Sequence, residues 1–167
     1  MTRALLVIDI QNDYFAGGAL PLWQPEETEA RIVLAIGQAR ATGDRIILVR
    51  HVSASPAGLF VAGSAGAAIR PAILAAAGNV PTITKRYPDA FQETALAEHL
   101  AGIDELLVIG MMTQNCVVFT AMSRATDGFR VRVVGDLCTA PTEAVHRIAL
   151  NALRSKIEVA TAADVWG

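Results

Sequence analysis

The sequence has few of the residues on which several classes of function depend. It contains two cysteines, Cys116 and Cys138, and three histidines, without a Cys-x-x-Cys pair or the Cys/His spacing of a zinc site. Aromatic residues make up 5% of the chain, so the stacking surfaces that bind single-stranded nucleic acid are poorly supplied. We therefore expect reduced thiols and no nucleic-acid partner.

Long apolar runs and nucleotide-binding motifs are also missing. No stretch approaches the ~20 apolar residues that cross a bilayer, which predicts no association with a membrane. The first apolar run, residues 4–8, is followed at once by Asp9 and is too short for the core of a signal peptide. There is no glycine-rich dinucleotide fingerprint and no Gly-Lys-Ser/Thr phosphate loop. These absences favour a cytoplasmic protein without a nucleotide cofactor.

Length and composition fit one folded unit. The chain has 167 residues, of which 53% are hydrophobic and 18% charged, and its formal net charge is −2. This length allows a single hydrophobic core and leaves too few residues for a second, so we expect one domain over residues 1–167. The apolar share is high for the surface of a small monomer, which predicts a homo-oligomer, either a dimer or a tetramer.

Short apolar runs alternate with segments of helical spacing. Buried strands are predicted for the Val, Ile and Leu runs at residues 4–8, 45–49, 80–84, 105–109, 131–134 and 157–160. Helices are predicted at residues 30–41, 94–101, 117–126 and 142–153. The alternation predicts an α/β fold, a three-layer α/β/α sandwich around a doubly wound, mostly parallel sheet. The small-residue stretch 52–68 is predicted to be a surface loop, either a lid or a tolerated insertion.

Three polar residues follow predicted strands, where ligands of open α/β sheets bind. Asp9 and Lys85 each close an apolar run, and Cys116 precedes a helical segment whose N-terminus would lower the pKa of its thiol. Each residue alone has an ordinary interpretation: a turn cap, a solvated lysine and a buried inert thiol. Together they form a carboxylate, an ammonium and a thiol, a complete set for nucleophilic catalysis. Cys138 has no comparable partners.

The surrounding motifs are more specific than the three residues. Residues 9–14 read Asp-Ile-Gln-Asn-Asp-Tyr, and residues 110–117 read Gly-x-x-Thr-x-x-Cys-Val. With Lys85 between them, this order and spacing resemble the isochorismatase-like cysteine hydrolase family of the nicotinamidase/isochorismatase superfamily, which carries Asp, Lys and Cys on successive strand ends. The resemblance spans the chain.

The resemblance implies cofactor-free hydrolysis of a small amide or carbamoyl compound through a cysteine thioester. Asp9 would be the general base, Lys85 would hold Asp9 and Cys116 in place, and the backbone N–H groups of Met112 and Cys116 would bind the oxyanion. A cis peptide bond is expected between Met111 and Met112. The substrate pocket is predicted to include Tyr14, Leu20, His51, Phe91, Met111 and Asn115, although Tyr14 and Phe91 fit a role as core aromatics equally well.

One branch of the family, the nicotinamidases, has an Asp-x-His and a further His that bind a divalent metal. Here Val49 stands at the position of that Asp, only His51 matches, and residues 52–68 contain no histidine. The sequence therefore predicts no metal site. His99 and His146 lie in helical segments and are assigned no role.

Two alternatives to amide hydrolysis remain open. The first is hydrolysis of an isochorismate-type vinyl ether, for which a thiol nucleophile is not needed. The second is a non-catalytic binding protein or a thiol redox sensor, in which Cys116 would be oxidised and Cys138 would be a distant resolving thiol. The complete Asp9, Lys85 and Cys116 set favours the amidase.

Overall fold

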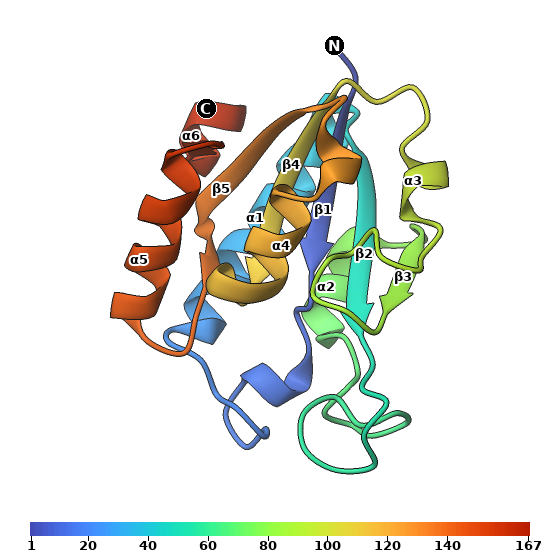
Figure 1. Ribbon diagram of the computed structural model, residues 1–167, viewed down its shortest axis with the longest axis vertical. Helices are drawn as coiled ribbons and strands as arrows, with labels where there is room; N and C mark the ends of the chain where they lie inside the picture. The colour runs from blue at the N-terminus through green and yellow to red at the C-terminus, as the bar shows by residue number, and fades with distance from the viewer.

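The computed structural model describes residues 1–167 and has one six-stranded parallel sheet. The strand order is β3-β2-β1-β4-β5-β6. The bounds are β1 (Arg3–Ile8), β2 (Arg45–His51), β3 (Thr82–Lys85), β4 (Glu105–Met111), β5 (Arg130–Thr139) and β6 (Glu158–Ala160). The predicted α/β fold is confirmed. The carboxyl ends of the strands meet at one edge of the sheet, the lower edge in Figure 1.

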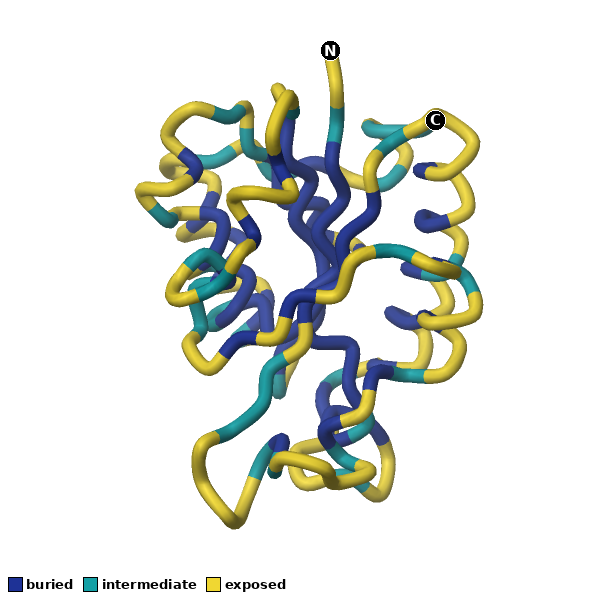
Figure 2. The backbone as a smooth tube through the Cα atoms, turned by 90° about the vertical axis from the view of Figure 1, so that its right-hand side faces the viewer, coloured by how far each residue is buried: buried dark blue, intermediate teal, exposed yellow.

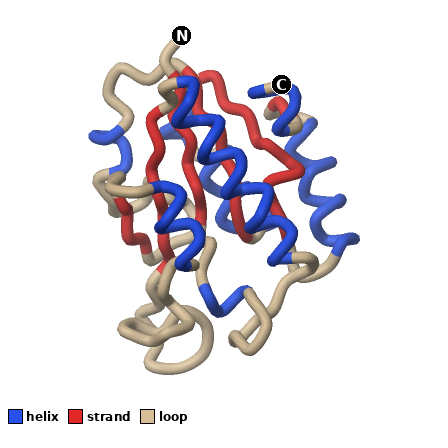
Figure 3. Tube along the Cα trace, turned by 180° about the vertical axis from the view of Figure 1, so that it is seen from behind, coloured by secondary structure: helices blue, strands red, loops and turns tan.

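Helices cover both faces of the sheet. One face carries α1 (Pro25–Thr42), α2 (Pro71–Ala77) and α6 (Ala162–Trp166), which lie in front of the strands in Figure 3. The other carries α3 (Leu96–His99), α4 (Val118–Ala121) and α5 (Glu143–Arg154). Each face buries its own apolar cluster, and the central strands run between them as the dark core of Figure 2. Every residue of β4 is buried, which explains why all of them after Glu105 are apolar or glycine. No helix is both long and apolar enough to cross a bilayer.

The prediction of one continuous helix over residues 117–126 is wrong. The chain instead makes a π-helical turn, η2 (Thr113–Val117), then the four-residue α4 and a 3-10 turn, η3 (Arg124–Thr126). Ser123 ends the helical path because its hydroxyl oxygen accepts the N–H of Ala125, a local bond that competes with helix continuation. A short 3-10 turn, η1 (Asn12–Tyr14), follows β1.

Other boundaries differ from the prediction by a few residues. The third strand begins and ends later than predicted, so that Lys85 is its last residue. The predicted helix at 94–101 is reduced to four residues, since the Thr94 hydroxyl bonds to the backbone at its start. Two helices were not predicted: α2 begins with Pro71 at its first position, and α6 begins with a capping box of Thr161 and Asp164.

The loop at residues 52–68 is held in place by the Gln-Asn-Asp motif that follows β1. The Gln11 side-chain amide donates to the carbonyls of His51 and Ala67, and the Asn12 amide donates to Ala65. The Asp13 carboxylate accepts the N–H of Phe60 at 2.7 Å. The loop therefore has a defined course beside the carboxyl ends of β1 and β2, at the lower right of Figure 1.

We predict that Gly110→Ala strongly destabilises the protein. Gly110 has a φ of +124°, and an added Cβ would lie 2.1 Å from the carbonyl oxygen of Ile8 on the neighbouring strand. The expected loss is roughly 3 kcal/mol of unfolding free energy, measured by urea titration. The control is Gly37→Ala, at an exposed helical site with open space, which should gain roughly 0.5–1 kcal/mol. Equal stability of the two variants would contradict the prediction.

Candidate active site

The sheet topology brings the three predicted catalytic residues together. Asp9 follows β1, Cys116 lies in the turn after the adjacent strand β4, and Lys85 ends β3 on the other side of β2. The Lys85 Nζ lies 2.9 Å from Asp9 Oδ2 and donates to Cys116 Sγ at 3.1 Å. The long lysine side chain therefore spans the intervening strand and joins the carboxylate to the thiol.

The Lys85 ammonium has a third partner that the sequence did not indicate. Its Nζ lies 2.9 Å from Nδ1 of His51, the residue opposite Lys85 in the β2–β3 register. An ammonium has three N–H donors, and Asp9, Cys116 and His51 lie within 3.1 Å of it. Asp9 is fully buried, and Lys85 and Cys116 are 1% and 3% exposed. Such a buried ion pair is stable only when its polar atoms are paired in this way.

Burial and neighbouring charges together keep both the lysine and the thiol protonated. Burial lowers the pKa of Lys85, but Asp9 and Cys116 outweigh it, and the net pKa is raised. Burial, followed by the charge of Asp9, raises the pKa of Cys116 to about 12, against the lowering effect of Lys85. The resting site therefore holds an ammonium and a protonated thiol.

The predicted lowering of the Cys116 pKa is wrong for this resting site. The prediction relied on a helix N-terminus at Cys116, but the residue lies inside the π-helical turn, followed by a helix of only four residues. The dipole of so short a helix is small, while burial of the thiol disfavours its charged form. The proton of Cys116 must therefore be removed by a base. Asp9 can serve as that base, because it is ion-paired with Lys85 and neither of its oxygens accepts a hydrogen bond.

The backbone next to the thiol has a donor that is available for the predicted oxyanion site, whose role stays a prediction. A cis peptide bond joins Met111 and Met112, as the resemblance implies. The Met112 carbonyl accepts the N–H groups of Asn115 and Val117, whereas the N–H of Met112 donates to no group of the protein. This free donor lies in the turn that carries Cys116, where the carbonyl oxygen of a substrate would need it.

Two aromatic rings stand beside the triad. Tyr14 is 1% exposed, and burial, with further contributions from Asp9 and Cys116, raises the pKa of its phenol. Its ring packs edge-on against Phe60 with centroids 4.8 Å apart, and the Phe60 ring is 5.9 Å from that of His51. Phe60 was not predicted, because nothing in the sequence of loop 52–68 indicates that the Asp13 carboxylate fixes it here.

The remaining predicted pocket residues differ in their burial and in their distance from the triad along the chain. Met111 is buried at the end of β4, and Asn115 is partly exposed next to Cys116. Phe91 packs against the apolar cluster that includes Cys116, which fits a core role as well as a pocket role. Leu20 is 37% exposed in the loop after η1, and its part in the pocket stays a prediction.

Three potential metal ligands lie close together at this site. Atoms of Asp9, His51 and Cys116 are all within 4.8 Å of one another. Each of the three is bonded to the Lys85 ammonium, so a cation at their centre would meet a fixed positive charge. The donor set therefore fits an ammonium better than a resident metal ion.

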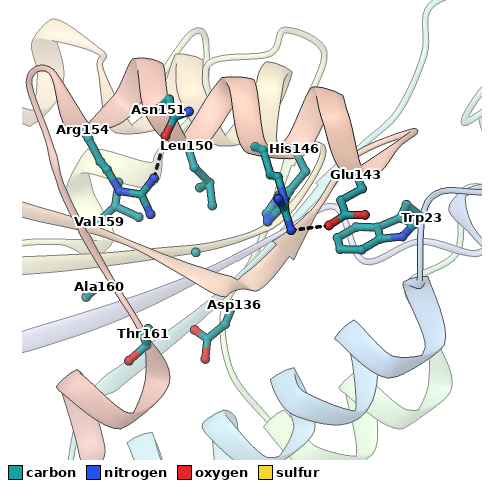
Figure 4. Close-up of a pocket in the computed structure, with 12 residues that line it drawn as sticks. Trp23, Asp136, Glu143, His146, Leu150, Asn151, Arg154, Val159, Ala160 and Thr161 are labelled. Atoms are coloured by element: carbon teal, nitrogen blue, oxygen red, sulfur yellow. Dashed lines mark hydrogen bonds and ion pairs between the residues drawn. The ribbon is translucent and has the colours of Figure 1, made fainter.

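The largest cavity does not contain the triad. A groove of about 540 Å³ lies between α5 and the β5–β6 edge, with Trp23 at one end, as Figure 4 shows. Its wall includes His146, whose Nδ1 is 2.8 Å from Thr113 Oγ1 in the turn that carries Cys116. His146, to which the sequence gave no role, therefore supports the nucleophile turn from behind.

Comparisons with known proteins agree with this geometry. Residues 3–164 match the isochorismatase domain. An uncharacterized isochorismatase family protein of Bacillus subtilis is 34% identical, over 85% of this chain and 80% of its own. The maleamate amidohydrolase of Pseudomonas putida is 31% identical, over 84% and 76%. The crystal structure of a proposed isochorismatase hydrolase from Oleispira antarctica superposes with a TM-score of 0.90 at 30% identity, covering 98% and 95%.

We predict that alkylation of Cys116 by iodoacetamide keeps accelerating up to about pH 10, because its pKa is raised to about 12. An ordinary thiol levels off above its pKa of about 8.5. Asp9→Asn removes a charge that raises this pKa and should shift the profile to lower pH, whereas Lys85→Gln should shift it upward. Peptide mass spectrometry gives the rates, with glutathione in the same solution as the reference for an ordinary thiol. A wild-type plateau near pH 9 would contradict the prediction.

Proposed function

The chain belongs to the isochorismatase family, and on this premise we propose that it is a cysteine hydrolase that cleaves the C–N bond of a small amide or carbamoyl compound. The observation that carries the proposal is the buried Lys85 ammonium, which lies 2.9 Å from the Asp9 carboxylate and 3.1 Å from the Cys116 sulfur. This arrangement pairs a nucleophile with a base and a fixed positive charge.

The first half of the reaction forms a thioester. Asp9 takes the proton of the Cys116 thiol as the sulfur attacks the carbonyl carbon, so a free thiolate need not accumulate. Lys85 stabilises the charge that develops on sulfur, and the N–H groups of Met112 and Cys116 bind the oxyanion. When the C–N bond breaks, the proton held by Asp9 passes to the nitrogen, and ammonia or an amine leaves.

The second half hydrolyses the thioester. Water attacks the acyl carbon while Asp9 accepts one of its protons, and the tetrahedral intermediate expels the sulfur. The proton then returns from Asp9 to Cys116, and the acid product dissociates. Both halves use the same base and the same oxyanion donors, and the only added reactant is water.

The burial of the triad favours a small substrate. Met112 is 9% exposed and Cys116 3%, and the rings of Tyr14 and Phe60 stand close by. A bulky acyl group would have to displace loop 52–68, which the Asp13 carboxylate holds through Phe60. We therefore expect the substrates to be compounds of a few carbon atoms or a single ring, handled by a cytoplasmic homo-oligomer.

The test is a panel of small amides that includes nicotinamide and maleamate, with release of ammonia as the readout. At least one amide should be hydrolysed, and Cys116→Ala should lower kcat by roughly 10³-fold or more, since the covalent route is lost. Acid quenching during turnover should trap an acyl group on the peptide that contains Cys116. Cys138→Ala is the matched control and should keep its activity.

Three results would contradict the proposal. Full activity of Cys116→Ala would exclude the thioester route. Hydrolysis of a vinyl ether, without cleavage of any amide, would favour the isochorismatase reaction. Reversible oxidation of Cys116 by peroxide, again without amide cleavage, would favour a thiol sensor.

A further inference from the structure

We propose that His51 is a substrate-binding residue, whose Nε2–H donates a hydrogen bond to an acceptor oxygen on the substrate. This inference rests on the proposed function and deepens it, because it specifies which amides the site prefers. Three features of the structure support it: the tautomer of His51, the three contacts of the Lys85 ammonium, and the anchoring of the His51 backbone.

The contact with Lys85 fixes the tautomer of His51. The two nitrogens, Lys85 Nζ and His51 Nδ1, are 2.9 Å apart. An ammonium can only donate, so Nδ1 must accept, and the proton of a neutral imidazole is then on Nε2. A doubly protonated ring would point an N–H at the ammonium. Burial and the charge of Lys85 also lower the pKa of His51.

The Nε2–H group of His51 is a free hydrogen-bond donor. His51 Nε2 has no hydrogen-bond partner in the protein, and the residue is half-buried, with its Nδ1 side closed by the fully buried Lys85. Nε2 is therefore the ring nitrogen that remains for a group from outside the protein. A ring nitrogen of His51 lies within 4.8 Å of atoms of Asp9 and Cys116, so the ring as a whole is next to the reacting groups.

Lys85 cannot take over this role. Its ammonium makes an ion pair with Asp9 and contacts Cys116 and His51, all within 3.1 Å, and Asp9 is an acceptor. A polar substrate atom near the scissile carbonyl must therefore find another donor. His51 is suited to this, because Gln11 fixes its backbone on both sides: Gln11 Oε1 accepts the His51 N–H at 2.8 Å, and Gln11 Nε2 donates to the His51 carbonyl at 2.8 Å.

The substrate class follows from the chemistry of this donor. A neutral imidazole N–H beside a buried ammonium favours an oxygen acceptor, which is either a carboxylate or a second carbonyl on the acyl part of the amide. Succinamate carries such an oxygen, whereas butyramide has a methyl group in the corresponding position. We therefore expect the enzyme to prefer succinamate over butyramide.

The first test is binding, which does not depend on turnover. Nitrogen-15 NMR of the Cys116→Ala variant should show His51 protonated on Nε2 alone at pH 7.5, with the His51→Gln spectrum giving the assignment. Succinamate should shift the Nε2 resonance, and butyramide should not. A proton on Nδ1, or equal shifts with both compounds, would overturn the inference even if the chain is an active amidase.

The second test is kinetic and uses the same pair of amides. His51→Leu also removes a partner of Lys85, so both amides should lose kcat/KM, but succinamate should lose roughly 10- to 100-fold more than butyramide, since only succinamate also loses a hydrogen bond. His51→Gln, which keeps a donor, should recover part of the loss. The control is His99→Leu at an exposed site. An equal fall for both amides, together with slower alkylation of Cys116, would mean that His51 only positions Lys85.

If wild-type protein hydrolyses neither amide nor any other member of the panel, the proposed function fails. The NMR titration still decides the inference in that case, because a selective shift of His51 by succinamate reports binding alone. The two failures are therefore distinguishable.

Discussion

The candidate site depends on one buried ammonium. Lys85 Nζ lies 2.9, 3.1 and 2.9 Å from a carboxylate, a sulfur and an imidazole nitrogen, and the residue is 1% exposed. Removing one partner of a buried charge pair costs about 3–5 kcal/mol, because the other charge is left without compensation. The same contacts fix the geometry for catalysis, so stability and function rest on the same atoms. The charge of Lys85 also makes this group of three potential metal ligands unfavourable for a cation.

The fold supplies what this ammonium needs. Parallel strands deliver Asp9, Lys85 and the Cys116 turn to one edge of the sheet, and the apolar clusters on both faces exclude water from their side chains. The motif after β1 positions two residues of the site. Gln11 hydrogen-bonds to the N–H and the carbonyl of His51, and the Asp13 carboxylate accepts the N–H of Phe60. The polar run at residues 11–13 is therefore a scaffold for the site, while the chemistry belongs to Asp9 before it.

The sequence predicted the parts of the molecule that follow from local pattern. Apolar runs located the strands, and charged residues at their ends located Asp9, Lys85 and Cys116. It could not predict the partner of His51, because that contact comes from the register of β2 against β3. The position of Phe60 depends on the hydrogen bond that its N–H donates to the Asp13 carboxylate in η1, and the pKa of Cys116 depends on burial rather than on the helix that follows it. These features depend on contacts between segments that are far apart in the sequence, so local sequence patterns do not reveal them.

Neutron diffraction of the free protein tests the central claim most directly, because it locates the protons. The account predicts three deuterons on Lys85 Nζ, directed at Asp9, Cys116 and His51, one deuteron on Cys116 Sγ, and one on His51 Nε2. A neutral lysine amine, a proton on His51 Nδ1, or a metal ion bound by Asp9, His51 and Cys116 would contradict it.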